Sequence, residues 1–210
     1  MAIIMNEYLD CGCHLGIWKI TEDLDLLLSK ITLTREELET LERFTYTPRK
    51  IEWLSVRVLL KAMTNNELSI YYNGNRKPFI KGNSHYISIS HSRDLTSILL
   101  SSKMKVGIDL EYMSHRICSI SHKFINENDS ITDNEEQKKY HLYIHWCAKE
   151  ALYKICDKQD INFRDSLTTE PFQPSDSGKI QGRVHNRSRN ELFNLNYFNL
   201  GNYVVVWCCK

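Results

Sequence analysis

The 210-residue sequence predicts an α+β fold, because helical and extended patterns occur in separate runs along the chain. Helix signals dominate residues 21–60, and short strand patterns follow between residues 85 and 111. An amphipathic helix pattern over 140–156 then precedes a second run of short strands. We find neither an internal repeat nor a flexible linker in the sequence.

The N-terminal elements are predicted from caps and turn residues. Thr34 followed by Glu37 forms a capping box, and Pro48 suits the first turn of a helix. Asn-Gly within NGNRKP (73–78) is a strong turn signal. The expected elements are a strand over 14–20, a short helix capped by Thr21 and running to about Lys30, a second helix over 35–44, and a third helix from Pro48 that carries Trp53, Leu54, Val56, Leu59 and Leu60.

The rest of the chain is expected to consist of short strands around one helix. The helix over 140–156 has an apolar stripe at 4-3-4 spacing, formed by Ile144, Ala148, Ala151 and Ile155. The preceding segment, 126–139, is polar and acidic and is expected to be a loop or a solvated helix end. The expected strands cover 85–91, 95–101, 105–111, 178–184, 191–198 and 203–208.

The composition is typical of a soluble globular protein and argues against two classes of partner. Hydrophobic residues make up 42% and charged residues 25%, and the formal net charge is +1, so no overall attraction to polyanions is encoded. No apolar run approaches the roughly 20 residues that span a membrane. The start, MAIIMNEYLD, lacks the basic region of a signal peptide. We therefore expect a cytoplasmic protein that binds neither nucleic acid nor membrane.

The seven cysteines are odd in number and scattered along the chain, as Cys11, Cys13, Cys118, Cys147, Cys156, Cys208 and Cys209. In a reducing compartment we expect most to be thiols packed as small apolar groups, none of them catalytic and none in a required disulfide. The segment CGCH (11–14) suggests zinc, but it lacks a second half at finger-like spacing, so we do not predict a metal site there.

Two carboxylates stand two residues apart in VGIDLE (106–111). Alternate residues of a strand point to one face, so Asp109 and Glu111 are expected to face the same way. Paired carboxylates repel unless a cation lies between them. Gly107 permits close approach of another backbone, or a bulge. The simpler alternative is a solvated strand end with two unrelated acids.

The helix over 140–156 contributes a third acid in WCAKEALYK. Glu150 and Lys154 lie on nearly the same side of this helix, whereas Lys149 is about 100° away. The two could form a simple surface pair. Alternatively, Glu150 completes an all-oxygen Mg²⁺ site while Lys154 meets a phosphate, since Mg²⁺ favours a few carboxylates, waters and substrate phosphates.

The segment YISISHS (86–92) alternates apolar and polar residues and ends in Ser90-His91-Ser92. No Gly-x-Ser-x-Gly elbow surrounds either serine, and adjacent Ser and His point to opposite faces of a strand, so a hydrolase triad is not indicated. His91 can equally be a hydrogen-bonded strand-end residue. Several basic residues are either solvated surface groups or phosphate ligands: Arg49, Lys50, Arg57, Arg76 and Lys77.

Four segments in this order resemble the successive motifs of the 4'-phosphopantetheinyl transferase superfamily: RKP (76–78), SISHS (88–92), VGIDLE (106–111) and WCAKEALYK (146–154). The core of the resemblance is G-[IV]-D-x-E followed by W-x-x-K-E-x-x-x-K, with Glu111 and Glu150 39 residues apart. The length and the N-terminal half resemble the surfactin-synthetase-activating type rather than the short trimeric holo-acyl-carrier-protein synthases.

The resemblance implies a monomer of two similar α+β halves, 1–104 and 105–210, in a pseudo-two-fold arrangement with coenzyme A in the cleft between them. It implies that Asp109, Glu111 and Glu150 bind the metal. It places Lys77 and Pro78 beside the adenine and 3'-phosphate, Ser90 and His91 at the nucleotide's phosphates, and Lys149 and Lys154 near the pyrophosphate. An N-terminal arginine for the 3'-phosphate is harder to align, with Arg49 as the first choice and Lys50 and Arg57 behind it.

The activity that the resemblance implies is transfer of 4'-phosphopantetheine from coenzyme A to a serine of an apo carrier protein, with release of 3',5'-ADP. Mg²⁺ would neutralise charge on the pyrophosphate, Lys154 would stabilise the leaving group, and either Glu150 or a metal-bound water would take the serine proton. The carrier's pathway (fatty-acid, polyketide or non-ribosomal peptide) stays open.

Two other functions remain possible on the residues alone. One is a Mg²⁺-dependent nuclease or phosphohydrolase built on the same three acids, which gives no reason for the RKP and SHS motifs. The other is a protein that binds coenzyme A or a carrier domain without turnover, which has no need of all three carboxylates.

Overall fold

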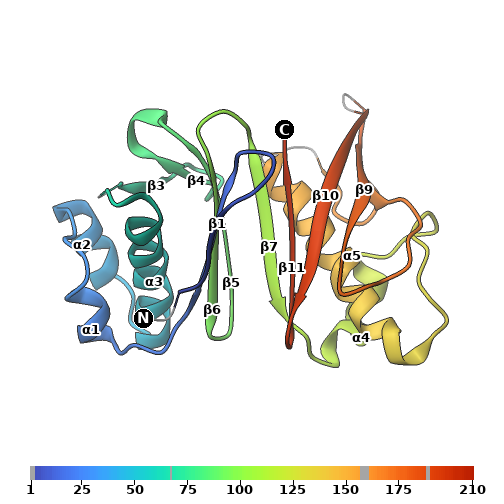
Figure 1. The fold of residues 1–210 in the computed structure, drawn as a ribbon, viewed down its shortest axis with the longest axis horizontal. Helices are drawn as coiled ribbons and strands as arrows, with labels where there is room; N and C mark the ends of the chain where they lie inside the picture. Colours follow the sequence, from blue (N-terminus) through green and yellow to red (C-terminus); the bar gives the residue numbers. More distant parts are fainter. Residues whose placement is uncertain (1–2, 67, 157–160, 188–189) are drawn as a thin grey trace.

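The computed structural model describes residues 3–66, 68–156, 161–187 and 190–210. Two antiparallel sheets stand side by side in the middle of the molecule, with helices on the outer side of each (Figure 1). The fold is therefore α+β, as the sequence predicts. Within the described part of the chain, no helix combines the length and apolar character needed to cross a lipid bilayer.

The N-terminal half consists of one sheet, a hairpin and three helices. The sheet has the order β1-β2-β6-β5, and helix α3 packs against it. A separate hairpin, β3-β4, joins α3 to β5. The bounds are β1 Ile3–Tyr8, β2 His14–Lys19, α1 Leu24–Leu28, α2 Arg35–Glu42, α3 Thr47–Thr64, β3 Ile70–Tyr72, β4 Pro78–Ile80, a short 3₁₀ turn Lys81–Asn83, β5 Tyr86–Ser92 and β6 Leu95–Ser101.

The caps of these helices test the sequence analysis directly. The Thr34 hydroxyl accepts a hydrogen bond from the Glu37 N–H, and the Glu37 carboxylate accepts one from the Thr34 N–H, so the predicted capping box is confirmed. Pro48 lies in the first turn of α3, also as predicted. The prediction of Thr21 as a cap is wrong: α1 starts later, and the Asp23 carboxylate caps it by accepting from the Leu26 N–H.

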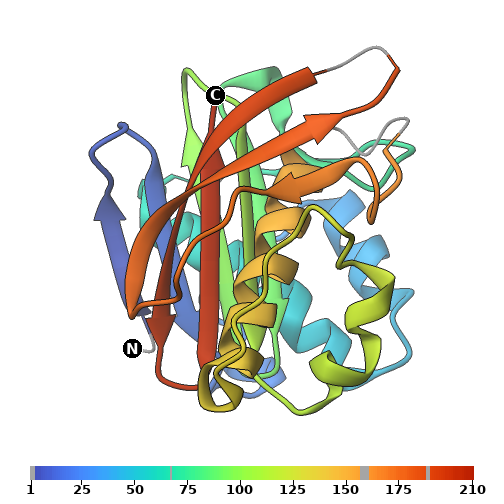
Figure 2. The same ribbon diagram turned by 90° about the vertical axis from the view of Figure 1, so that its right-hand side faces the viewer.

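The C-terminal half repeats the combination of a sheet with one long helix. Its sheet has the order β7-β11-β10-β9-β8, and α5 lies across the outer face (Figure 2). The bounds are β7 Val106–Tyr112, α4 Arg116–Ile120, a 3₁₀ turn Ser121–Lys123, α5 Glu135–Ile155, β8 Leu167–Thr169, β9 Ser177–His185, β10 Asn190–Leu200 and β11 Tyr203–Cys209. Helix α5 begins at Glu135, before the apolar stripe, because Asn134 caps it.

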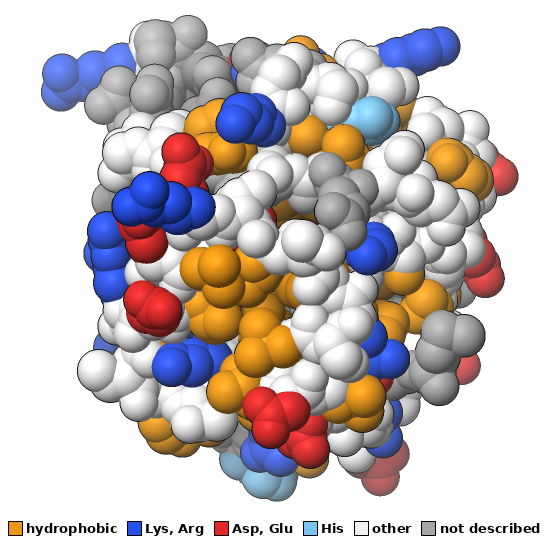
Figure 3. All heavy atoms as spheres, turned by 90° about the vertical axis from the view of Figure 1, so that its left-hand side faces the viewer, with side chains coloured by type: hydrophobic (Ala, Val, Ile, Leu, Met, Phe, Trp, Pro, Cys, Tyr) orange, Lys and Arg blue, Asp and Glu red, His pale blue; other side chains and the backbone are white. Residues whose placement is uncertain are grey.

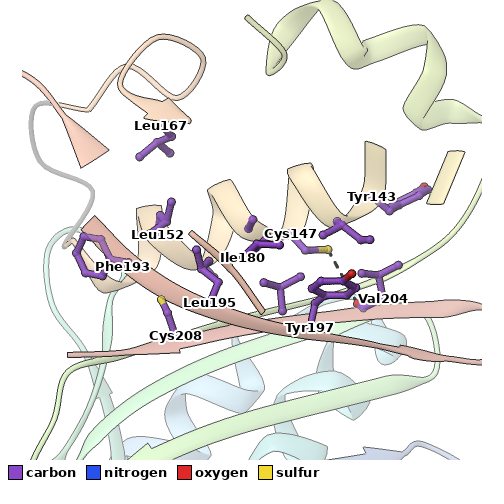
Figure 4. Close-up of a cluster of buried hydrophobic side chains, with 14 of the residues drawn as sticks. Tyr143, Cys147, Leu152, Leu167, Ile180, Phe193, Leu195, Tyr197, Val204 and Cys208 are labelled. Carbon is purple, nitrogen blue, oxygen red and sulfur yellow. Dashed lines mark hydrogen bonds between the residues drawn. The ribbon is translucent and has the colours of Figure 1, made fainter. Parts of the chain in front are cut away.

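Three hydrophobic clusters stabilise this arrangement. One lies between α3 and the N-terminal sheet, and a second lies between α5 and the C-terminal sheet, where Cys147, Leu152, Leu195 and Val204 pack together (Figure 4). A third cluster joins the inner faces of the two sheets and includes Leu15 and Ile108. By contrast, the outer face of α1 and α2 mixes apolar side chains with charged ones (Figure 3).

The two sheets also meet along their edge strands, β5 and β7. Three serines of β5 alternate along one face and all reach β7. The hydroxyl of Ser88 accepts from the Ile108 N–H at 3.0 Å, and that of Ser92 accepts from the Tyr112 N–H at 3.1 Å. Serine side chains thus satisfy backbone donors of an edge strand that would otherwise be unpaired. This contact positions Ser90 between the two halves.

Candidate functional site

The site is built around the two carboxylates of β7. Asp109 and Glu111 lie on the side of the strand that faces α5, as their spacing predicts, together with Gly107. A Cβ at Gly107 would overlap the Ala151 carbonyl oxygen. Helix α5 therefore approaches β7 closely only because residue 107 is glycine, which brings the acids of the strand and the side chains of the helix into contact.

The two oxygens of Asp109 have different surroundings. Asp109 Oδ1 accepts from the Ser90 hydroxyl at 2.8 Å and from the Lys154 ammonium at 2.7 Å. Asp109 Oδ2 is buried and accepts no hydrogen bond, the single such side-chain atom among the residues described here. A buried acceptor without a donor is costly, so this oxygen is suited to a cation.

Glu111 lies beside Asp109 and is held by hydrogen bonds. It accepts from the Ser92 hydroxyl at 2.7 Å, and Trp146 of α5 also donates to it. Burial and, next, the charge of Asp109 raise the pKa of Glu111 to about 7, although Ser92 and Lys154 act in the opposite direction. The charge of Asp109 thus disfavours ionisation of Glu111, and a divalent cation bound beside them would offset this repulsion.

One ridge of α5 faces these acids. Trp146, Glu150 and Lys154 follow one another at intervals of four residues, so they lie in a row along the helix. Trp146 contacts Glu111, Lys154 contacts Asp109, and Glu150 lies between them on the helix with its side chain partly exposed. Lys154 therefore pairs with a strand carboxylate of β7.

Lys149 does not belong to this group of residues. Its side chain is fully buried, and its ammonium donates to Asp129 and to the Phe124 carbonyl oxygen, at 2.5 Å in each case. The structure thus places the Lys149 ammonium with Asp129 and Phe124 and does not bring it to the acids of β7. Because Lys149 is about 100° from Glu150 on the helix, its side chain anchors the loop before α5 instead.

A pocket opens next to Lys154 in the N-terminal half. Its lining includes five residues that the sequence analysis singled out for coenzyme A: Arg49, Lys77, Pro78, His91 and Lys154. They come from α3, from the turn and start of the β3-β4 hairpin, from β5 and from α5. Ser90 is beside the pocket, because its hydroxyl accepts from Lys154 at 3.1 Å. Of the three candidates for the N-terminal basic residue, Arg49 lines the pocket and the other two do not.

Arg57, one of those alternatives, has a structural role. Its side chain is almost fully buried, it pairs with Glu37 at 3.0 Å, and its guanidinium stacks on Trp53. The helix that presents Arg49 to the pocket thus buries Arg57 against its neighbour α2.

Arg49 and His91 form a contact at the mouth of the pocket. Arg49 Nη1 lies 3.0 Å from His91 Nε2 and 2.9 Å from the Glu52 carboxylate. A guanidinium can only donate, so His91 Nε2 is the acceptor and the imidazole is neutral. Burial, and after it the charges of Arg49 and Lys154 against that of Glu52, lower the pKa of His91, in agreement with the neutral form.

The structure adds residues that the sequence analysis did not select. Glu52 orients Arg49, Tyr72 lines the pocket, Ser92 holds Glu111, and Trp146 donates to it. Two of these residues could have been identified from their spacing in the sequence. Glu52 is three residues after Arg49 on a helix, and Ser92 is two residues after Ser90 on a strand. The contacts of Tyr72 and Trp146 could not be identified from spacing, because they depend on how distant elements pack together.

The two carboxylates of β7, Asp109 and Glu111, are of the kind that a divalent metal such as Mg²⁺ binds. The donors are all carboxylate oxygens, one of them has no hydrogen-bond partner, and burial together with the charge of Asp109 raises the pKa of the neighbouring acid, Glu111. No sulfur or imidazole ligand lies among Asp109, Glu111 and Glu150, so the chemistry of the set favours a hard cation.

Comparison with protein families assigns the segment that carries this site. Residues 105–208 match the family model ACPS, described as the 4'-phosphopantetheinyl transferase superfamily. This segment includes the strand acids, helix α5 and the C-terminal sheet up to residue 208 of its last strand. No curated protein matches the sequence at a significant level.

Residues 105–208 are therefore a 4'-phosphopantetheinyl transferase superfamily domain. The superfamily uses coenzyme A as a substrate, generally with a divalent metal, and acts on carrier proteins. The domain supports a phosphopantetheine-transfer activity in general.

Proposed function

We propose that this protein transfers the 4'-phosphopantetheine group of coenzyme A to a serine of an apo carrier protein and releases 3',5'-ADP, as a holo-acyl-carrier-protein synthase. The observation that carries this proposal is the position of Lys154. Its ammonium contacts Asp109 of the acid pair and lines the pocket that also contains Arg49, Lys77 and His91. An acid pair suited to a metal thus adjoins a basic pocket suited to a phosphorylated nucleotide.

The acids would hold Mg²⁺ through Asp109, Glu111 and Glu150. When bound there, Mg²⁺ supplies charge neutralisation for the pyrophosphate of coenzyme A. Lys154 already lies beside Asp109 and would stabilise the charge that develops on the departing 3',5'-ADP. Glu150, partly exposed on the ridge of α5, is the carboxylate that we expect to accept the proton of the carrier's serine.

The basic pocket would bind the nucleotide. Arg49 and Lys77 are assigned to the 3'-phosphate, Pro78 to the adenine face, and Ser90 with His91 to the remaining phosphates. A neutral His91 donates through Nδ1, so it can bond a phosphate oxygen without adding charge. The lysine ammonium and the arginine guanidinium provide the positive charge that the ligand needs.

The wider architecture follows the same proposal. We assign the chain to the two-half, surfactin-synthetase-activating type, with halves 1–104 and 105–210 related by a pseudo-two-fold axis and the active site in the cleft between them. Each half has one antiparallel sheet with a long helix, α3 or α5, on its outer face, which supports this assignment. The protein is expected to act as a cytoplasmic monomer whose acceptor is an acyl, polyketide or peptidyl carrier.

The decisive experiment is a mass-spectrometric assay with coenzyme A, Mg²⁺ and a panel of apo carrier proteins. Transfer adds the mass of phosphopantetheine to a carrier and produces 3',5'-ADP. Asp109→Ala should abolish the gain, whereas Asp133→Ala, an exposed aspartate in the loop before α5, should leave it unchanged. Free phosphopantetheine without modified carrier would instead indicate a hydrolase, and binding without any product would indicate a non-enzymatic protein.

A further inference from the structure

Three cysteine thiols from the two ends of the chain meet away from the acid site. The Sγ atoms of Cys11, Cys13 and Cys209 all lie within 4.8 Å of one another. Cys11 and Cys13 belong to the turn between β1 and β2, and Cys209 is the last residue of β11. The motif CGCH (11–14) is not followed nearby by a second pair of metal-binding residues, but the fold brings a third thiol, that of Cys209, from the C-terminal end of the chain.

The turn that carries two of these thiols has a defined shape. The Leu9 N–H donates to the Cys13 carbonyl and the Gly12 N–H donates to the Leu9 carbonyl, at 2.8 Å in both cases. Gly12 has φ +79°, a left-handed conformation that glycine adopts readily. The C-G-C spacing therefore allows the tight turn that places Cys11 and Cys13 together.

The third thiol is fixed by the end of the C-terminal sheet. Cys209 pairs with Val106 in the ladder between β11 and β7. Beyond it, the backbones of Lys105 and Lys210 exchange two hydrogen bonds, of 2.7 and 2.9 Å. Because side chains alternate along β11, Cys208 points into the core beneath α5, whereas Cys209 points toward the first hairpin.

The histidine of CGCH does not contribute to this group of atoms. His14 Nε2 lies 2.7 Å from Asn6 Oδ1, and its ring stacks on Tyr8. The Ser101 hydroxyl does contribute, since it hydrogen-bonds to the Cys13 sulfur. Ser101 Oγ already accepts from the N–H groups of Lys103 and Met104, which leaves its own hydrogen to donate. A donor of this kind stabilises a metal-bound thiolate.

We propose that Cys11, Cys13 and Cys209 form a binding site for one soft, thiophilic cation, Zn²⁺ or Cu⁺. Three thiolates with no imidazole or carboxylate among them favour these ions over Mg²⁺. Zinc–sulfur bonds of about 2.3 Å in a tetrahedron place sulfur atoms about 3.8 Å apart, so the present separations need to shrink by about 1 Å at most. Cys13 is fully buried and Cys11 is exposed, which gives the cation access from solvent.

Such a cation would have a structural effect on the whole molecule. It would tie the first hairpin of one half to the last strand of the other, across the cluster that joins the two sheets. The same interface carries the contact between β5 and β7. Binding to the folded state alone stabilises that state, so the melting temperature should rise with cation concentration.

The test uses the full chain, reduced with a phosphine and freed of metal. Co²⁺ is the first probe, because a thiolate-to-cobalt charge-transfer band reports sulfur ligation and is not produced by the carboxylates of the acid site. Zn²⁺ then displaces Co²⁺ in one arm, and Cu⁺ under anaerobic conditions competes with a copper chelator in another. The same titrations in an Asp109→Asn background remove binding at the acids.

We expect the protein to bind one equivalent of Co²⁺ and to show the charge-transfer band. Zn²⁺ or Cu⁺, whichever ion binds more tightly, should displace the Co²⁺. Cys11→Ser, Cys13→Ser and Cys209→Ser should each weaken binding at least tenfold, as the loss of a metal ligand requires. Cys118→Ser, an exposed thiol on α4, is the matched control and should bind like the wild type. Cys11→Ser changes only an exposed turn residue, so it separates ligation from folding.

Three results would overturn the proposal. The first is no charge-transfer band in the reduced wild type. The second is a band of equal strength in all three serine variants. The third is oxidation of two of these thiols to a disulfide in air, combined with no cation binding in reductant, which would make the group a redox pair.

Discussion

Replacing Glu111 with glutamine should stabilise the metal-free protein and remove transfer activity at the same time. Burial and the charge of Asp109 raise the pKa of Glu111 from 4.5 to about 7. A carboxyl whose pKa is raised on folding keeps its proton in the folded state while the unfolded chain ionises. The free energy of unfolding therefore falls as pH rises from about 4.5 to about 7 and is level with respect to this group above that window.

The size of the expected stabilisation follows from the difference between the unfolded-state and folded-state pKa of Glu111. A change from 4.5 to about 7 corresponds to roughly 3 kcal/mol as an upper limit, and the partial exposure of Glu111 to solvent reduces it to about 2 kcal/mol. Glu111→Gln has no charge to bury, and its amide can still accept from Ser92. The variant and the wild type should then be equally stable near pH 4, and the variant more stable by that amount at pH 8.

Urea unfolding in the presence of a chelator, at pH values from 4 to 8, measures this directly. Glu127→Gln, in the exposed loop before α5, is the control and should follow the wild type at every pH. Added Mg²⁺ should stabilise the wild type more than Glu111→Gln, and less at pH 6 than at pH 8, since the Glu111 proton competes with the metal. This account of the acid pair would be refuted if the free energy of unfolding of Glu111→Gln depended on pH as strongly as that of the wild type. It would also be refuted if the variant were less stable than the wild type at pH 8.

Five further substitutions test the other parts of the site. Asp109→Ala or Glu150→Ala should abolish transfer in folded protein, and activity within about threefold of wild type with unchanged Mg²⁺ dependence would contradict the metal site. Lys77→Ala and His91→Ala should each weaken coenzyme A binding by about 1.5–3 kcal/mol in calorimetry, with a smaller loss for dephospho-coenzyme A where the residue meets the 3'-phosphate. Identical losses for both ligands would show that neither residue contacts that group. Gly107→Ala should cost about 1–3 kcal/mol of stability in urea unfolding and reduce transfer, because its Cβ would push α5 away from β7; a neutral outcome would show that the helix moves without consequence.

Local sequence patterns predicted most of the elements that position the site. The alternation in YISISHS and VGIDLE gave strands close to β5 and β7, and the stripe of 140–156 gave most of α5. Patterns of this kind depend on which face of an element is buried, which a single segment reveals. The short elements β1, β3, β4, α4 and β8 were not predicted, because segments of three to six residues are too short to show a clear hydrophobic period.

The candidate site was less predictable than the elements that carry it. Spacing along a strand placed Asp109 and Glu111 on one face, but the bond from Ser90 to Asp109 depends on how two sheet edges meet. The three-thiol group could not be expected at all, because Cys209 approaches Cys11 and Cys13 only once the last strand pairs with β7. These contacts could not be predicted because the residues are far apart in the sequence, and not because of their chemical type.

The two lysines of WCAKEALYK show how a helix separates residues that share a motif. Lys149 is turned inward, and burial lowers its pKa even though Asp129 pairs with it. Lys154, further along the helix, reaches Ser90 of the other half, Asp109 and the Ile108 carbonyl oxygen. One lysine therefore fastens the helix to its own half, and the other joins the two halves at the acid pair. The Lys154 ammonium bonds to groups of both halves, so the pocket and the acids cannot move apart without leaving the buried Asp109 carboxylate unpaired. The geometry of the site therefore depends on the contact between the halves.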